Sequence, residues 1–363
     1  MKAFAIYRLP HSKQCTLIEQ TSGTPHKLST ISELNGCSGF VVAPFKIDNS
    51  HPTLLIRPDK VTTMAVKEPS GILPEILSEK NHKDDYSIDF ANFHSQLEQG
   101  TFQKIVLARS ANVSINTCYD INSNDGIMQL FWKACQSYPR LFIALVALPD
   151  GSCWLTATPE ILLEGIGTKW RTIALAGTMQ LEGEELNGEG EDIRWSTKNI
   201  QEQRYVSTYI AKCLEQFSIP FTQEGPRTVR AANLVHLRSD FTFDMPANSN
   251  IGQLLQVLHP TPAVCGLPKK ETYDFILQNE HSARQYYSGF MGPLHMTSTS
   301  TDNSFETHLY VSLRCMKITG NDCTLYAGGG LLRDSVLDQE WHETEVKMQT
   351  MKALFKKRIA TNV

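Results

Sequence analysis

The chain has 363 residues, of which 41% are hydrophobic and 20% charged, a composition that is ordinary for a globular protein with a large core. Its 34 basic and 38 acidic residues leave a formal net charge of -4, so the charge balance gives no support to nucleic-acid binding. Nine scattered cysteines form no CxxC pair, so they indicate neither a zinc site nor a disulfide framework. No long apolar run predicts a membrane span, and we expect a cytoplasmic protein without a nucleic-acid or membrane partner.

The predicted elements begin with short apolar runs bounded by turn residues, which are typical of strands. Such runs occur at residues 3–7, 39–42, 53–56, 104–109, 141–148, 153–158, 172–176, 308–318 and 323–327. Apolar residues at helical spacing predict helices over 86–100, 126–138, 191–217 and 254–258. Residues 60–85 mix Pro, Gly, Ser and charged residues and predict a loop, while Ser335 predicts the capped start of a last helix.

These elements show no regular alternation of strand, helix and strand along the chain. That order favours an α+β fold with a largely antiparallel sheet over a doubly wound fold. We find no internal repeat, no low-complexity tract and no linker that separates domains.

The densest chemistry lies near the end, where three glycines (328–330) precede the last predicted helix. Three consecutive glycines favour a close approach of the backbone to a ligand. At ~100° per residue, Glu340, Glu343 and Lys347 fall within ~60° of one another on that helix, whereas Glu345 points away. Such a face is either solvated or, behind a flexible backbone, a site for a divalent cation and an anionic ligand.

Two further residues have both a structural and a catalytic interpretation. Lys104 alternates with apolar residues on a predicted strand, so it either snorkels at an edge or acts as a buried general base. Glu160 follows a Thr-Pro corner and precedes three aliphatic residues. It either faces solvent or is a general acid whose pKa is raised by apolar neighbours.

Glu202 continues the apolar stripe of its predicted helix, and an inward carboxylate must be paired, protonated or bound to metal. With Glu343 it offers the oxygen ligands that Mg²⁺ prefers, and no set of His and Cys residues favours a softer metal. Arg314 lies in a strand-like run, where its guanidinium suits either a bound carboxylate or a structural ion pair.

Taken in order, these segments resemble the chorismate-utilising enzyme family, which includes isochorismate, salicylate, anthranilate and aminodeoxychorismate synthases. The matching segments are KIVLAR, TPEILL, LAGT, KNIQEQ, HLRS, HPTPAVCGLP, RQYYSGFMG, SLRC, AGGG and EWHETEVK. The resemblance implies one domain over residues 1–363, with a divergent N-terminal part (1–100) and a motif-bearing catalytic part (101–355). It implies two packed antiparallel sheets, outer helices and an active site in a deep cleft.

The resemblance also implies individual roles. Glu202 and Glu343 would bind Mg²⁺ together with the C1 carboxylate of chorismate, and Glu340 would support the ion through a water. The implied substrate pocket consists of Gly177, His236, Thr261, Tyr287, Arg314, Gly328, Gly329, Gly330 and Lys347. Within it, Tyr287 and Arg314 would hold the enolpyruvyl carboxylate. Residues 197–199 read Thr-Lys-Asn where the family often has Glu-Lys-Asp, which leaves the surroundings of Glu202 open.

Two positions favour members of the family that add water. By the resemblance, Lys104 stands where those members carry a general base, and Ala176 stands where aminodeoxychorismate synthases carry a nucleophilic lysine. The implied reaction is that of an isochorismate synthase: Lys104 activates water for attack at C2, and Glu160 protonates the departing C4 hydroxyl. Salicylate synthase is the first alternative, ahead of anthranilate or aminodeoxychorismate synthase, and a non-catalytic chorismate-binding homologue is a third hypothesis. We expect a monomer without an obligate protein partner, in menaquinone or, alternatively, siderophore biosynthesis.

Overall fold

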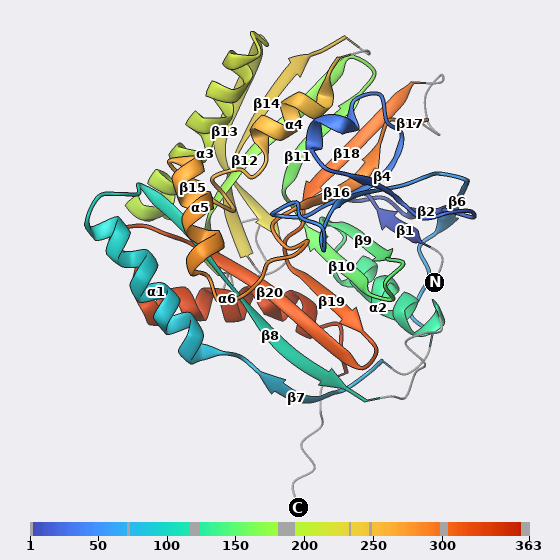
Figure 1. Ribbon diagram of the computed structural model, residues 1–363, viewed down its shortest axis with the longest axis horizontal. Helices are drawn as coiled ribbons and strands as arrows, with labels where there is room; N and C mark the ends of the chain where they lie inside the picture. The colour runs from blue at the N-terminus through green and yellow to red at the C-terminus, as the bar shows by residue number, and fades with distance from the viewer. Residues whose placement is uncertain are drawn as a thin grey trace, which may run out of the picture.

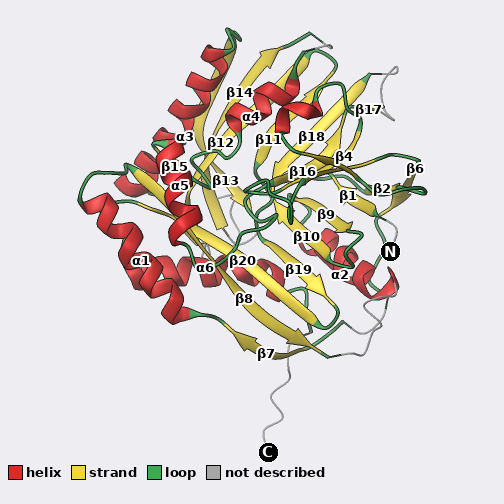
Figure 2. Ribbon diagram, in the orientation of Figure 1, coloured by secondary structure: helices red, strands yellow, loops and turns green. Residues whose placement is uncertain are grey.

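The computed structural model describes residues 3–70, 73–116, 124–180, 193–231, 234–246, 249–297 and 304–356. Within these ranges the chain forms two large antiparallel sheets with α-helices on the outside (Figures 1 and 2). The predicted α+β class with two packed sheets is confirmed. None of the described helices is long and apolar enough to cross a membrane.

The first sheet consists of strands β1 (Phe4–Arg8), β2 (Gln14–Glu19), β6 (Lys60–Ala65), β7 (Ile76–Lys80), β8 (Lys104–Ile115), β9 (Phe142–Ala147), β10 (Cys153–Thr158), β15 (Gly266–Leu267), β19 (Cys315–Thr319) and β20 (Asp322–Leu331). Their order is β15-β8-β20-β19-β10-β9-β1-β2-β6, and β7 pairs with β8 outside this path. The long strands β8 and β20 pair along ten residues, which fixes the glycine segment of β20 beside the start of β8.

The second sheet consists of strands β3 (His26–Leu28), β4 (Gly39–Ala43), β5 (Thr53–Ile56), β11 (Ile161–Ile166), β12 (Lys169–Gln180), β13 (Phe221–Ala231), β14 (Leu234–Asp244), β16 (Phe290–Leu294), β17 (Met296–Thr297) and β18 (Phe305–Val311). Their order is β13-β14-β12-β11-β18-β16-β4-β5-β3, and β17 pairs with β18. Strands from the first hundred residues therefore belong to both sheets, because β1 pairs with β9 and β4 pairs with β16.

The helices are α1 (Lys83–Glu98), α2 (Asn124–Ser137), α3 (Thr197–Gln216), α4 (Ile251–Leu258), α5 (Lys269–Asn279) and α6 (Leu337–Lys352), with a short 3-10 helix at Ile31–Leu34. Residues of α2 and α6 pack on the outer face of the first sheet, and residues of α3 and α4 pack on the second. Helices α1 and α5 cover the end of the first sheet at β8 and β15 (Figure 1).

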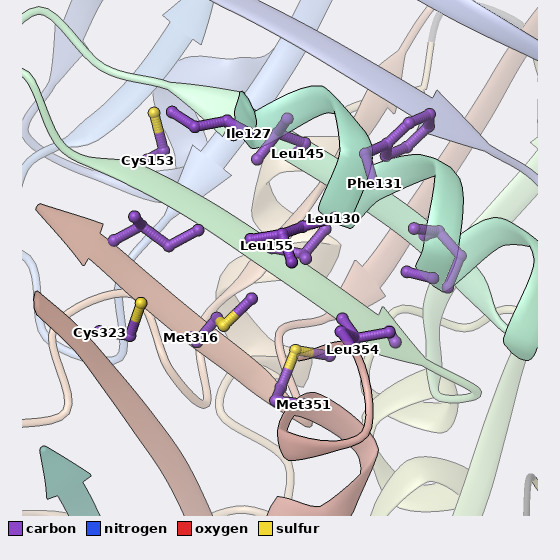
Figure 3. Packing of buried hydrophobic residues seen from close by; sticks show 14 of the residues in the cluster. Ile127, Leu130, Phe131, Leu145, Cys153, Leu155, Met316, Cys323, Met351 and Leu354 are labelled. Carbon is purple, nitrogen blue, oxygen red and sulfur yellow. The ribbon is translucent and has the colours of Figure 1, made fainter. Parts of the chain in front are cut away.

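The hydrophobic core has a layer between the sheets and a layer outside each of them. Between the sheets, the rings of Phe142 on β9 and Tyr310 on β18 stack with centroids 4.3 Å apart. Outside the first sheet, Leu130 of α2 and Met351 of α6 pack toward Leu155 of β10 (Figure 3). Full burial of such a side chain contributes about 1.5–3 kcal/mol. The sheets therefore provide a rigid frame for residues placed between them.

The predicted loop over residues 60–85 is wrong for most of its length. It contains β6, β7 and the start of α1. β6 lies at the edge of the first sheet and pairs only with β2 among the described strands, so its side chains are largely exposed. Charged and polar residues on an edge strand protect against aggregation, and they also hide the strand from a search for apolar runs.

Two other boundaries differ from the predictions. The helix predicted to begin at residue 191 begins at Thr197 within the described residues, because the Ser196 side chain accepts a hydrogen bond from the Asn199 amide and caps it. The single strand predicted over 308–318 is two strands, β18 and β19, that belong to different sheets. Arg314 lies between them with φ +46°, so its predicted place within a strand is wrong.

Ser335 does not cap the last helix, since Val336 is the N-cap residue of α6. The Ser335 hydroxyl instead accepts from the Leu332 amide at 3.1 Å and donates to Glu340 Oε1 at 2.7 Å. Its side chain therefore organises the loop before α6 and holds a carboxylate of the helix.

Candidate active site

The candidate site forms where the chain passes from one sheet to the other. Glu160 lies between β10 of the first sheet and β11 of the second, and Arg314 lies between β18 of the second and β19 of the first. The two crossings are hydrogen-bonded, since Val311 N donates to Glu160 O at 2.9 Å and Ala157 N donates to Arg314 O at 3.2 Å. Residues 154 positions apart in the chain are thereby held side by side.

These crossings border an internal cavity of about 70 Å³. The cavity brings together nine of the predicted site residues: Glu160, Gly177, Glu202, His236, Tyr287, Arg314, Gly328, Gly330 and Lys347. The other predicted residues, Lys104, Thr261, Gly329, Glu340 and Glu343, are not among those that line it. Two of them contact residues that do line it, since Lys104 pairs with Glu202 and Glu343 pairs with Lys347.

Lys104 is the first residue of β8 and has no exposed surface. Its Nζ atom lies 2.9 Å from Glu202 Oε1, and the other oxygen of Glu202 accepts a hydrogen bond from the Gly177 amide at 3.1 Å. The snorkelling interpretation of Lys104 is therefore wrong. Burial alone would raise the pKa of Glu202, but the charges of Lys104, Lys347 and Lys198 lower it below the ordinary value.

The three glycines of β20 make room for different functional groups. A Cβ atom at Gly330 would collide with Glu202 and approach the Lys104 side chain, and one at Gly328 would lie 2.8 Å from the Tyr287 hydroxyl. A Cβ at Gly329 would instead lie 3.1 Å from Glu340 Oε2. Neighbouring residues of a strand face opposite sides, so carboxylates from α3 and α6 approach the glycine segment from opposite faces.

Every carboxylate beside this segment is paired with a lysine. The pairs are Glu202 with Lys104, Glu343 with Lys347, and Glu340 with Lys198. We call these six residues the lysine–carboxylate end of the site. Their formal charges balance, and the Lys347 ammonium also donates to the carbonyl of Gly328 at 2.8 Å, which ties α6 to β20.

Glu340 differs from an ordinary surface glutamate on a helix. Its exposed fraction is 1%, and its Oε2 atom has no hydrogen-bond partner among the described residues. Burial and the neighbouring charge of Glu343 both raise the pKa of Glu340. A buried oxygen without a partner beside a second carboxylate is the kind of position that a cation stabilises.

The arrangement of the described side chains does not form a ready metal site, since no three His, Cys, Asp or Glu side chains among them are grouped closely enough to hold an ion. The lysine partners and the opposite approach of the carboxylates explain this. The donor set nevertheless fits Mg²⁺, because it offers carboxylate oxygens, one of them without a partner, on both sides of a backbone segment without side chains.

The opposite end of the cavity is built from Arg314, His236 and Tyr287, which we call the arginine end. Arg314 Nη2 lies 2.5 Å from His236 Nε2, and Arg314 Nη1 has no hydrogen-bond partner among the described residues. Burial lowers the pKa of Arg314 to about 10, so the guanidinium stays charged at neutral pH. No described carboxylate forms an ion pair with it. A buried cation of this kind fits an anionic ligand.

Glu160 lies between the two ends and is buried, with an exposed fraction of 4%. Burial raises its pKa to about 7, although Lys104, Arg314, Lys347 and the Thr261 hydroxyl oppose the rise. The interpretation of Glu160 as a solvent-facing residue is therefore wrong. A carboxyl group with this pKa holds its proton about half of the time near neutral pH, which suits a general acid.

A larger open depression of about 920 Å³ lies elsewhere on the second sheet, near Glu164, Trp170 and Phe221. Its Glu164 carboxylate is already bonded to Arg171 and His308. None of the predicted site residues lines it. The convergence of buried lysines, carboxyl groups and an arginine favours the smaller cavity as the reactive site, because size alone supplies no chemistry.

Sequence reasoning missed three residues that support the site. Lys198 lies four residues before Glu202 on α3, so helical spacing alone places it on the same face. Ser335 binds Glu340 and was interpreted as a cap. Tyr326 stacks on Tyr287 with ring centroids 5.5 Å apart, and only the register of β20 reveals this contact.

The chain is similar to known proteins over most of its length. Residues 55–356 match the family described as chorismate binding enzyme. Isochorismate synthase EntC of Escherichia coli is 28% identical over 255 residues, which are 69% of this chain and 62% of EntC. The salicylate biosynthesis isochorismate synthase of Pseudomonas aeruginosa is 31% identical over 261 residues, which are 71% of this chain and 52% of that protein. The chain thus spans less than two thirds of these relatives.

The solved structure of MenF, the menaquinone-specific isochorismate synthase from Escherichia coli, has the same fold. Its TM-score is 0.78 at 21% identity, and the match covers 98% of this chain and 89% of MenF. At this identity the likeness concerns the arrangement of sheets and helices.

Proposed function

Because the chain belongs to the chorismate binding enzyme family, we propose that it converts chorismate to isochorismate by adding water at C2 and removing the C4 hydroxyl. The observation that carries this proposal is the pair formed by Lys104 and Glu160. Both are buried, and burial raises the pKa of Glu160 to about 7. A base and an acid with separate environments are what such an exchange needs.

The proposed substrate orientation follows from the charges of the two ends. Arg314 has a free guanidinium nitrogen, and the hydroxyl of Tyr287 lies beside Gly328. Together they suit the enolpyruvyl carboxylate, while the ring carboxylate would lie toward the lysine–carboxylate end. The cavity of about 70 Å³ is smaller than a ring-sized ligand. Binding therefore requires side chains that now pair across the site, such as Lys347, to move.

Mg²⁺ is the proposed cofactor, with Glu202 and Glu343 as ligands and Glu340 as the residue that supports them through a water. When bound, the ion would neutralise and polarise the C1 carboxylate of chorismate. The oxygen donors and the unpaired Glu340 Oε2 support this assignment.

In the proposed reaction, Lys104 Nζ in its neutral form accepts a proton from a water molecule, whose oxygen attacks C2. Glu160 in its protonated form donates its proton to the C4 oxygen as that hydroxyl leaves, and the ring double bonds shift. The reverse reaction exchanges the two roles, with Glu160 as base and Lys104 as acid. The side chains around both residues exclude bulk water, so the protons stay with the reacting oxygens.

The decisive experiment is product identification from chorismate and Mg²⁺, with and without ammonium. Isochorismate without pyruvate supports the proposal. Pyruvate in equal amount to the chorismate consumed would establish salicylate synthase activity instead, and an amino product formed only with ammonium would exclude water addition. An inactive protein that still binds chorismate would be a non-catalytic relative.

We further propose that the isochorismate supplies menaquinone biosynthesis, with a siderophore pathway as the alternative, on the basis of the sequence resemblance alone. Growth of a deletion strain restored by menaquinone, and not by a catechol siderophore, tests this. The single domain over residues 1–363, the cytoplasmic location, the monomeric state and the absence of an obligate partner stay predictions.

A further inference from the structure

His236 occupies a position that the proposed proton transfers leave unused. It lies on β14, with an exposed fraction of 5%, and both of its ring nitrogens have partners. Nδ1 lies 3.1 Å from the carbonyl oxygen of Gly177 and 3.3 Å from the Thr178 hydroxyl. Nε2 lies 2.5 Å from Arg314 Nη2.

These partners fix the protonation state of the ring. A carbonyl oxygen only accepts, so the bond with Gly177 requires a proton on Nδ1. A guanidinium only donates, so the bond with Arg314 requires a bare Nε2. His236 is therefore neutral in the Nδ1–H form, and burial together with the charges of Arg314 and Lys347 lowers its pKa well below the ordinary value. It has no proton to give toward the cavity.

The backbone of Gly177 extends this connection across the site. Gly177 has φ +72° at an irregularity in the pairing of β12 with β14, a conformation that glycine adopts readily. Its N–H donates to Glu202 and its C=O accepts from His236. A continuous set of hydrogen bonds thus runs from Glu202 through Gly177 and His236 to Arg314, and it joins the two ends of the pocket.

We infer that His236 is a positioning residue: as a neutral acceptor it orients the Arg314 guanidinium toward the substrate carboxylate at the arginine end. This deepens the proposed function and rests on it. Arg314 has the conformational freedom of a long side chain and no carboxylate partner among the described residues, so the bond that it donates to His236 holds one nitrogen while leaving Nη1 for the ligand. His236 then affects the substrate through Arg314 and takes no part in proton transfer.

The first test measures the tautomer directly, without substrate or metal. A long-range ¹H–¹⁵N correlation spectrum of the protein labelled with ¹⁵N-histidine should show one ring that is protonated at Nδ1 and bare at Nε2 across neutral pH. The His236→Asn variant assigns that signal by its absence. A ring protonated at Nε2, or one that titrates near pH 6, would overturn the inference.

The second test uses two substitutions that each keep one bond. The amide of Asn reaches about as far as Nδ1 and can still donate to Gly177, whereas the longer Gln places an oxygen near the position of Nε2 and can still accept from Arg314. We expect His236→Asn to raise KM for chorismate about 10-fold with a smaller change in kcat, as for loss of one bond to a charged group. His236→Gln should stay within about threefold of the wild type in KM.

A double-mutant cycle separates action through Arg314 from direct contact. In an Arg314→Met background, His236→Asn should change KM by less than about twofold, because methionine donates no hydrogen bond and the bond to His236 is already gone. Additive effects of the two substitutions, or a fall in kcat with KM unchanged, would overturn the inference. A purely structural role would lower thermal stability equally in the Asn and Gln variants and would not spare KM in the Gln variant.

Failure of the proposed function is recognised separately. If the wild-type protein forms no isochorismate from chorismate and Mg²⁺, the reaction assignment fails, while the tautomer spectrum still decides the state of His236. If isochorismate forms but the cycle is additive, the reaction assignment stands and the role of His236 is wrong.

Discussion

The two ends of the pocket use positive charge in opposite ways. At the lysine–carboxylate end, three ammonium groups are matched by three carboxylates, and each pair is in contact. At the arginine end, the guanidinium of Arg314 contacts a neutral imidazole and keeps one nitrogen without a partner. One end is balanced without a ligand, whereas the guanidinium at the other end forms no ion pair with a carboxylate among the residues that the structure describes.

This difference suggests a division of work. A balanced set of ion pairs is open to exchange, because an added cation can take over a carboxylate while the lysine turns to another anion. A buried cation held by a neutral acceptor is fixed in place and selects for a carboxylate. The lysine–carboxylate end is therefore suited to assemble during binding, and the arginine end is suited to recognise the substrate beforehand.

The largest effect is expected for Lys104→Ala at the lysine–carboxylate end. Loss of the general base should lower kcat at least 10²–10⁴-fold, while chorismate binding to the arginine end is retained. Rates are measured by isochorismate formation and binding by equilibrium titration. Since Lys104 Nζ is 2.9 Å from Glu202, the substitution also leaves a carboxylate uncompensated and should lower the melting temperature.

The matched control for this prediction is Lys198→Ala. Lys198 also pairs with a buried carboxylate, Glu340, but it has no part in proton transfer. It should lose stability with a much smaller loss of kcat. If Lys104→Ala kept more than a small fraction of the wild-type rate, or if both variants lost kcat equally, Lys104 would not be the base.

The next effect concerns Glu160, which lies between the ends. Glu160→Gln keeps the shape of the side chain and removes its proton, so kcat should fall about 10²-fold or more. The pKa of Glu160 is raised to about 7, so the acid form dominates below that pH and is lost above it. With Lys104 in the neutral form that the proposed reaction requires, the forward rate of the wild type should therefore decline as the pH rises through about 7.

A pH–rate profile of kcat in the forward direction checks this sign. A decline above about pH 7 in the wild type that is missing in Glu160→Gln is the expected result. A forward rate that rises with pH through this window would assign the acid role to another group.

The sequence predicted much of the site because its clues were local. The spacing of Glu343 and Lys347 on one helix gives the ion pair that the structure contains, and the glycine run lies against the side chains of Glu202, Glu340 and Tyr287. The inward position of Glu202 followed from its place on an apolar stripe. Such features depend on helical period and strand alternation, which can be deduced from the order of residues.

What the sequence could not give depends on contacts between distant segments. The crossings at Glu160 and Arg314 are hydrogen-bonded neighbours, yet no periodicity links them. The break between β18 and β19 was hidden because both flanks are apolar, so a change of sheet looked like one strand. The partner of Ser335 was likewise hidden, since the same serine fits a cap and a bond to Glu340.

A smaller effect is expected at Glu343. This carboxylate belongs to the lysine–carboxylate end, where an added cation can replace its lysine partner. Its side chain is 29% exposed and is held by Lys347 at 2.6 Å. Glu343→Gln removes one charged oxygen donor, so the Mg²⁺ concentration for half-maximal activity should rise about 10-fold or more. Calorimetric titration of Mg²⁺ checks the affinity directly.

Glu345→Gln is the control on the same helix. Its carboxylate bonds to Arg109 and Lys352, away from the cavity. This variant should lose stability without any change in the Mg²⁺ titration. An unchanged titration for Glu343→Gln would refute its role as a ligand. The ion pairs of the lysine–carboxylate end would then have a structural role only.

The smallest effect is expected for Ser335→Ala. This substitution tests whether the hydrogen bond from Ser335 to Glu340 stabilises the lysine–carboxylate end. The substitution leaves the Leu332 amide without its acceptor and Glu340 Oε1 without one of its two donors. The free energy of unfolding should fall by about 1–2 kcal/mol, because both groups are buried. Urea denaturation measures this, and Ser87→Ala, at an exposed hydroxyl of α1, should stay within about 0.5 kcal/mol of the wild type.

If Glu340 supports Mg²⁺ through water, Ser335→Ala should also lower the affinity for Mg²⁺ a few-fold, since a misplaced carboxylate binds less well. A loss of stability with an unchanged titration would confine Ser335 to the loop before α6 and would separate Glu340 from the metal.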